Sequence, residues 1–399
     1  ASLWTPRTTL LCSTAWAKVL LMFNNSWAKT LLLLLLVSTA SADHDTYMKK
    51  MAVLDGTLYI ATSYYGSSGY ESKLWSYDGS TMTELTDLAG SYIYHIQAVG
   101  SKLAIFMGNS IYLYNPSDAS LTQVVSSSNY YENYVSYDSK IYFTYYSSGS
   151  HYLQSFDGST ISSGVSLGSN NPQYFVTYNS KIYWLQGSGS TYYLYYYDGS
   201  DVVSTTEYLS YYPQGRMTVL DNKLTIFANN QIYSYDGTAS SPSIDYKVAS
   251  GGYPYNATAV GDRIYFGVYS SGNYYLKYYD GSSVSSASST ALGGDLSSGA
   301  SGMVAYSGRP IFYFMDSNSN SVKLGGYYNG SLYNLASDTE NDPPSKASDL
   351  ETSSSGTRLH SFTEYSGTLY WMKDQQALWK YKIAAIEFSS GYPFSYNVS

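Results

Sequence analysis

The sequence predicts an all-β fold, a β-propeller with eight four-stranded blades of about 40 to 45 residues each. Two short motifs alternate along the chain in eight copies, at the interval that is typical of propeller blades. Tyrosine, isoleucine, valine and threonine dominate between serine and glycine clusters, and no segment has the periodicity of a long amphipathic helix. A propeller with seven blades, in which the last unit folds elsewhere, and an open solenoid are the alternatives.

The first motif is a short polar turn followed by an apolar or aromatic strand. It occurs at Asp55–Ile60, Gly100–Ile105, Asp138–Phe143, Asn179–Trp184, Asp221–Ile226, Gly261–Phe266, Gly308–Tyr313 and Gly367–Trp371. The second motif is an aromatic strand that ends, in most copies, at Asp-Gly or Asn-Gly. It occurs at Leu74–Ser80, Ile111–Pro116, Leu153–Ser159, Leu194–Ser200, Ile232–Thr238, Leu276–Ser282, Tyr327–Ser331 and Leu378–Tyr381.

These motifs place four strands, A to D, in each unit. Strand A precedes the polar turn, strand B follows it, strand C ends at Asp-Gly, and strand D is the Ser/Thr/Val-rich stretch that comes next. We expect the Asp-Gly pairs to form tight hairpin turns, because glycine tolerates the positive φ of a primed turn. The last strand D is expected at residues 383–388, so the ring would close without exchanging a strand between the termini.

Residues 1–42 are expected to lie outside the fold. A start at Met22 would give a secretory signal peptide with one basic residue, six leucines and cleavage after Ala42, preceded by upstream sequence. The leucine run is too short to span a membrane. Residues 43–399 then form a single propeller domain, with a polar surface loop inserted at about residues 337–356.

The segment Lys73–Ser80 resembles the secreted propellers built from ELWxxDGT-type (hyalin-like) repeats, which pair an "LYF" strand with an "LW-x-x-DG-T" hairpin. The resemblance extends from residue 53 to residue 381, although later copies replace Trp75 by tyrosine, glutamine or lysine. Kelch propellers are a weaker match, because their regular Gly-Gly doublet is missing. The resemblance implies an extracellular β-propeller and no particular activity.

Composition and missing motifs exclude several function classes. The net charge of −8 argues against a nucleic-acid binder, which needs a basic stripe. No HxH, HExxH, calcium-loop or P-loop pattern occurs, and the sequence predicts no metal site, no cofactor and no catalytic residues. After residue 42, the asparagines of N-x-[ST] sequons, which are candidate glycosylation sites, are Asn256, Asn329 and Asn397.

The 50 tyrosines divide into two sets. One set recurs on strand B, at Tyr59, Tyr142, Tyr183, Tyr265 and Tyr370, where we expect packing between blades. The other set falls in segments expected to be B–C and D–A loops, which share one face of a propeller. These candidate ligand-binding residues are Tyr64, Tyr65, Tyr130, Tyr131, Tyr145, Tyr146, Tyr211, Tyr212, Tyr253, Tyr255 and Tyr269.

A tyrosine-rich face suits sugars, because a phenol ring packs on apolar C–H faces and its hydroxyl adds specificity. The expected function is therefore a secreted, extracellular, non-enzymatic module that binds a glycan or a glycoprotein. A structural matrix, adhesive or filament protein that associates with itself is the alternative, and a glycan-active enzyme is the third. After signal cleavage, no membrane span is expected.

Overall fold

A computed structural model defines the fold of the repeat region. It describes residues 50–66, 69–88, 90–209, 217–228, 231–237, 245–249, 252–292, 294–295, 302–316, 322–334, 342–349, 359–373 and 377–382. The predicted signal peptide lies outside these residues. In the described part every regular element is a strand, and none is a helix long and apolar enough to cross a membrane.

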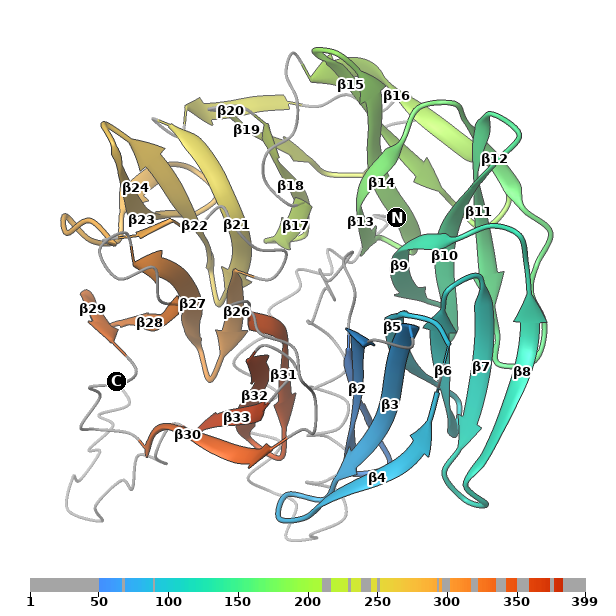
Figure 1. Cartoon of the computed structure of the whole chain (residues 1–399). Coiled ribbons are helices and arrows are strands. Elements are labelled where there is room, and N and C mark those ends of the chain that lie inside the picture. Colours follow the sequence, from blue (N-terminus) through green and yellow to red (C-terminus); the bar gives the residue numbers. More distant parts are fainter. Residues whose placement is uncertain are drawn as a thin grey trace, which may run out of the picture. The chain divides into compact units, whose positions relative to one another are not determined.

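Eight antiparallel sheets form a ring, which confirms the eight-bladed propeller (Figure 1). Blade one consists of β1 (Met51–Leu54), β2 (Thr57–Gly66), β3 (Gly69–Tyr77) and β4 (Met82–Asp87). Blade two consists of β5 (Ile93–Val99), β6 (Lys102–Met107), β7 (Ser110–Asn115) and β8 (Ser120–Ser126). Blade three consists of β9 (Tyr131–Tyr137), β10 (Lys140–Ser147), β11 (Ser150–Phe156) and β12 (Val165–Gly168). Blade four consists of β13 (Pro172–Tyr178), β14 (Lys181–Ser188), β15 (Thr191–Tyr197) and β16 (Val202–Leu209).

The remaining blades follow the same plan with local variations. Blade five consists of β17 (Met217–Leu220), β18 (Lys223–Ala228), β19 (Gln231–Tyr235) and β20 (Asp245–Ala249). Blade six consists of β21 (Tyr253–Val260), β22 (Arg263–Ser270), β23 (Asn273–Tyr279) and β24 (Val284–Ser286). Blade seven has β25 (Gly294–Asp295), β26 (Met303–Tyr306), β27 (Arg309–Asp316), β28 (Val322–Tyr328) and β29 (Ser331–Asn334). Blade eight has β30 (Asp342–Asp349), β31 (Leu359–Tyr365), β32 (Thr368–Lys373) and β33 (Ala377–Lys382).

The outer strand of blade eight differs from the prediction. The sheet order is β30-β33-β32-β31, so the segment before strand A supplies strand D. The expectation of a polar loop over residues 337–356 is therefore wrong for β30, and the strand expected at 383–388 lies outside the described residues. Pro343 and Pro344 fall at a register shift of this edge strand, where the missing N–H groups cost no ladder hydrogen bond.

The turns between strands A and B are the primed hairpins. Asp138 and Ser139 both have positive φ, as do Asn179 and Ser180, which is the geometry of a type I′ turn. The B–C connections are equally tight: β10 and β11 pair up to Ser147–Ser150 around Ser148 and Gly149. The sequence predicts loops at the B–C positions. In the structure, strands B and C instead extend up to a two-residue turn.

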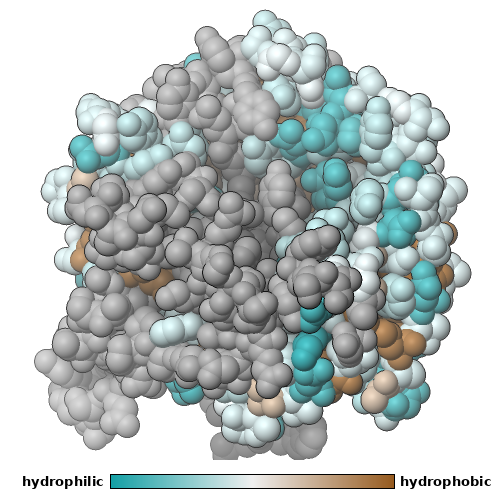
Figure 2. All heavy atoms as spheres, in the orientation of Figure 1, coloured by the Kyte–Doolittle hydropathy of each residue, from teal (hydrophilic) through white to brown (hydrophobic). Residues whose placement is uncertain are grey.

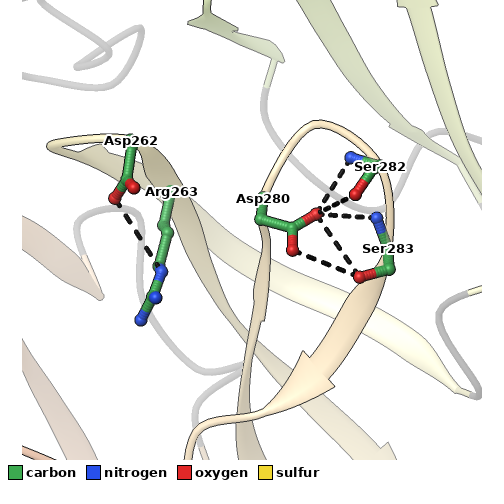
Figure 3. A network of polar contacts seen from close by, with 5 residues as sticks. All are labelled: Asp262, Arg263, Asp280, Ser282 and Ser283. Carbon is green, nitrogen blue, oxygen red and sulfur yellow. Dashed lines mark hydrogen bonds and ion pairs between the residues drawn. The ribbon is translucent and has the colours of Figure 1, made fainter.

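The repeated Asp-Gly-Ser motif forms a wider turn than predicted. In blade six the Asp280 carboxylate accepts hydrogen bonds from the backbone N–H of Ser282 at 2.9 Å and of Ser283 at 2.7 Å, and from both hydroxyls (Figure 3). These hydrogen bonds hold the pKa of Asp280 well below its usual range. The residue is thus the cap of a four-residue C–D loop, and the same pattern recurs at Asp78, Asp157 and Asp198.

The strand-B tyrosines pack between blades, as predicted. All five are buried, and each ring meets a strand-C tyrosine of the next blade at centroid distances between 5.6 and 6.2 Å. The pairs are Tyr59–Tyr114, Tyr142–Tyr197, Tyr183–Tyr235, Tyr265–Tyr327 and Tyr370–Tyr77. The last pair joins blade eight to blade one and closes the ring.

A second set of tyrosines, at the end of strand A, fastens each blade to the next. Their hydroxyls donate to backbone carbonyls in the A–B turn of the following blade at 2.5 to 2.8 Å. These bonds are Tyr137–Ser180, Tyr178–Asn222, Tyr306–Gly367 and Tyr365–Gly56. Sequence analysis missed this role, although a tyrosine directly before the polar turn recurs in four copies of the first motif.

Candidate functional site

Several candidate tyrosines lie in strands rather than in loops. Tyr145 and Tyr146 are in β10, Tyr255 is in β21 and Tyr269 is in β22. In an antiparallel blade, strand A begins, strand B ends and strand C begins at the same edge, which is the edge where the D–A connections also lie. We call this edge the tyrosine edge.

Cross-strand pairing places the candidates side by side in rows at this edge. In blade three, Tyr131, Tyr145 and Tyr152 are register partners across β9, β10 and β11. Blade six repeats the row with Tyr253, Tyr269 and Tyr274. The residue in strand C was not among the candidates in either blade, because only pairing reveals which position lies opposite Tyr145 or Tyr269.

The surroundings of the candidates differ. Tyr130 and Tyr146 are 62% and 54% exposed, Tyr269 is 41% exposed, and Tyr131 is buried. Tyr255 is half-buried and its ring lies 5.8 Å from that of Tyr274. The side chains of Tyr64, Tyr65 and Tyr253 and the whole of Tyr211 and Tyr212 lie outside the described part of the structure.

A hollow of about 350 Å³ lies between the outer strand of blade two and blade three. It contains two candidates, Tyr131 and Tyr145, together with residues from four other stretches of chain. The lining residues are Val124, Val125, Ser127, Asn129, Tyr131, Tyr145, Gln154 and Ile161. The wall thus combines apolar side chains, two phenol rings, two amides and a hydroxyl, and it carries no formal charge.

The two rings of the hollow are held in place by their neighbours. Tyr145 stacks on Tyr152 with centroids 5.1 Å apart and planes inclined by 16°. A Cβ atom at Gly164 would lie 2.7 Å from the Tyr145 hydroxyl, which is too close. Any other residue at position 164 would therefore force the Tyr145 side chain to move. Burial raises the pKa of both Tyr131 and Tyr145, so their hydroxyls stay neutral to a higher pH than that of an exposed tyrosine.

The polar groups of the hollow are also fixed. The Ser127 Oγ atom accepts a hydrogen bond from the backbone N–H of Asn129 at 3.0 Å. Gln154 donates from Nε2 to the carbonyl of Ser162 at 3.0 Å, and this orients its amide. Ser127 and Asn129 come from a D–A connection and Gln154 occupies a variable position of the second motif, so the repeat by itself could not identify them.

On the side of the propeller seen in Figure 2, few of the described surface residues are strongly hydrophobic or strongly hydrophilic. Pale residues of intermediate hydropathy predominate, and strongly hydrophobic and hydrophilic residues form small separate groups. Within the described residues, no three His, Cys, Asp or Glu side chains gather where they could hold a metal ion.

The described sequons differ in accessibility. Asn329 lies in the exposed type I′ turn between β28 and β29, whereas half-buried Asn256 lies in β21 with its amide nitrogen packed against Gly302. The third sequon, at Asn397, lies outside the described residues.

In a eukaryotic secretory host, we expect glycosylation at Asn329 and none at Asn256, because the transferase needs access to the amide nitrogen. The experiment is a deglycosylation mass shift measured in a background that carries Asn397→Gln. Adding Asn329→Gln should remove the shift. Loss of the shift with Asn256→Gln instead would contradict the prediction.

No family model matches the chain, and no curated protein matches it. Among solved structures it is similar to the computationally designed Ika8 protein (TM-score 0.52, 10% identity, 84% of this chain and 100% of that one). It is also similar to an acylaminoacyl peptidase of Pyrococcus horikoshii (TM-score 0.49, 12% identity, 82% and 57% of the chains) and to the β-propeller domain of the Trilobed protease of Pyrococcus furiosus (TM-score 0.47, 12% identity, 74% and 97%).

This chain therefore spans little more than half of the peptidase. At such identities a likeness shows the fold alone, and the ring of eight antiparallel sheets is that of a β-propeller.

Proposed function

We propose that this protein is a secreted, non-enzymatic binding module of the ELWxxDGT-repeat type, and that it binds a glycan in the hollow between blades two and three. The observation that carries the proposal is the wall of that hollow. Its volume of about 350 Å³ falls within the range of about 300–1,000 Å³ that is usual for small-molecule sites.

The chemistry of the wall suits a sugar. The half-buried ring of Tyr145 offers apolar surface for the C–H groups of a pyranose, and the largely buried Tyr131 and the two valines add to the apolar wall. The amides of Asn129 and Gln154 both donate and accept hydrogen bonds, as sugar hydroxyls do.

The absence of charge in this wall favours a neutral sugar. None of its lining residues is cationic, and the chain as a whole has a net charge of −8. A sialic acid, a uronic acid or a sulfated sugar would need a positive partner for its anion. The ligand class that we propose is thus a neutral hexose or N-acetylhexosamine.

A glycan array with residues 43–399 tests the proposal. We expect signals for neutral glycans that Tyr145→Ala weakens about 30-fold, because an aromatic anchor in a binding site is worth about 2 kcal/mol. Tyr208→Ala is the matched control, since Tyr208 is 56% exposed on β16 of blade four. No glycan signal, or equal signals for the wild type and Tyr145→Ala, would refute the proposal.

Gly164→Ala gives a second variant for the same array without removing a ring. The new methyl group must displace the end of the Tyr145 side chain, which reshapes the hollow at little cost in stability. We expect weaker glycan binding with an unchanged melting temperature. Ser163→Ala, at the exposed neighbouring position, should change neither.

A further inference from the structure

We infer that a ladder of four tyrosines extends the sugar site from the hollow across blades two and one, so that the ligand is a chain of neutral sugars rather than a single residue. The ladder consists of Tyr70, Tyr92, Tyr94 and Tyr130. This inference rests on the proposed function and concerns the length of the glycan, which the hollow alone does not define.

The four rings form one continuous series. Tyr70 and Tyr92 have centroids 5.7 Å apart, Tyr92 and Tyr94 are 5.2 Å apart, and Tyr94 and Tyr130 are 6.3 Å apart. Adjacent rings are inclined by 66 to 71°, the edge-to-face arrangement that aromatic pairs prefer. Each step is comparable to the width of one pyranose ring.

The ladder follows the tyrosine edge from blade to blade. Tyr70 is at the start of β3 in blade one. Tyr92 directly precedes β5 of blade two and Tyr94 is at its start, and Tyr130 directly precedes β9 in blade three. All four therefore lie at the edge where strands A and C begin. No single blade contains more than two of them, so only the ring arrangement creates the series.

Tyr130 connects the ladder to the hollow. Its neighbours in the chain, Asn129 and Tyr131, both line the hollow, and its own ring is 62% exposed and touches Tyr94. The far end, Tyr70, is also accessible, at 42%. A ligand seated in the hollow could thus continue over exposed ring surface in one direction.

The Tyr92 ring, in the middle of the ladder, contacts a buried lysine. The Nζ atom of Lys50, which is buried, lies 3.9 Å from the centroid of the Tyr92 ring. Burial lowers the pKa of Lys50 to about 7, so this amine contacts the ring face as a cation only in part at neutral pH. Rings that are ordered before binding lose little conformational entropy when a ligand packs on them.

A proline-rich peptide is the other ligand that uses rows of aromatic rings. A polyproline helix offers mainly carbonyl acceptors to its partner. The hollow at the end of the ladder presents the Gln154 amide, whose Nε2 already donates to Ser162 and whose Oε1 atom is an acceptor. A sugar hydroxyl can donate to that atom, and for this reason the observations favour a glycan.

Calorimetric titration with oligomers of one to six residues tests the inference, using β-1,4-linked glucose, β-1,4-linked N-acetylglucosamine and mannose series. For the series that binds, we expect the dissociation constant to fall at least about tenfold between the monomer and the hexamer, as added contacts of about 1.4 kcal/mol require. Tyr70→Ala and Tyr130→Ala should remove most of this gain. Tyr208→Ala, equally exposed on blade four, should leave it unchanged.

The outcomes separate the two proposals. Binding that is abolished by Tyr145→Ala but does not depend on oligomer length would overturn the ladder and leave the glycan site in place. If no neutral sugar of any length binds the wild type, the proposed function itself is wrong. Binding of a proline-rich peptide that Tyr70→Ala removes, without sugar binding, would overturn the sugar as the occupant.

Discussion

Raising the pH above 10 is expected to unfold the propeller cooperatively, with a midpoint between about pH 11 and 12. The cause is the set of tyrosines buried between blades. Burial raises the pKa of Tyr134 and Tyr183 well above the usual value and that of Tyr370 to about 12. These phenols stay neutral in the folded state, whereas in the unfolded chain they ionise near pH 10.

The sign of the effect follows from the raised pKa values. The stability from these groups is fully present below pH 10 and is lost as the pH rises from 10 toward the folded pKa. Each of the three hydroxyls lowers the free energy of unfolding by about 1.4 kcal/mol for each pH unit above 10. Together they remove a substantial part of the stability of a typical domain as the pH approaches 12.

The measurement compares tyrosinate absorbance with near-ultraviolet circular dichroism in one alkaline titration. The two should change together over a narrow pH range. Tyr183→Phe should shift the midpoint to higher pH, because it removes a buried hydroxyl whose ionisation the fold strongly disfavours. Ionisation of all tyrosines near pH 10 with an unchanged circular dichroism spectrum would contradict the prediction.

Trp184→Ala is expected to destabilise the propeller by about 3–5 kcal/mol, the usual cost of removing a buried tryptophan. Trp184 is fully buried in a core cluster shared by blades three and four. It stacks on Phe175 at 5.5 Å and on Tyr195 at 5.9 Å, and its Nε1 donates to Gln186 Oε1 at 3.0 Å. Removing the indole leaves a cavity and an unpaired buried amide oxygen.

Urea denaturation of the variant measures this cost. Trp184→Phe should lose less, since it keeps much of the packing while still giving up the hydrogen bond of about 1–3 kcal/mol. Tyr208→Ala, at an exposed site of the same blade, should stay within about 0.5 kcal/mol of the wild type. A change of less than 1 kcal/mol for Trp184→Ala would mean that the two blades do not depend on this cluster.

Strands B and C could be predicted because the residues that specify them lie close together in the sequence. The segment Ile182–Leu185 is buried on both sides because neighbouring blades cover both faces, so it reads as an apolar-aromatic run. The polar turn before it is equally clear, since Asn179 tolerates positive φ better than most residues. Both signals lie within a few residues of chain and need no partner.

The strand at the outer edge could not be predicted in the same way. It needs little hydrophobicity, because only one neighbouring strand covers it. The polar segment Asp342–Asp349 therefore looks like a loop in the sequence and becomes a strand through its pairing with β33. The Asp-Gly-Ser turns were placed correctly, but their width depends on the hydrogen bonds of the aspartate side chain.

By itself, the sequence determined the blade repeat and the burial of the strand-B tyrosines, because both are encoded in short motifs that recur in phase, and it favoured eight blades over seven. Only the tertiary structure decided which other residues meet. The hollow combines Val124 from blade two with Tyr145 and Gln154 from two strands of blade three, and the ladder joins rings of three blades. Contacts between residues far apart in the chain depend on how strands pair and how blades pack, and no local pattern records them.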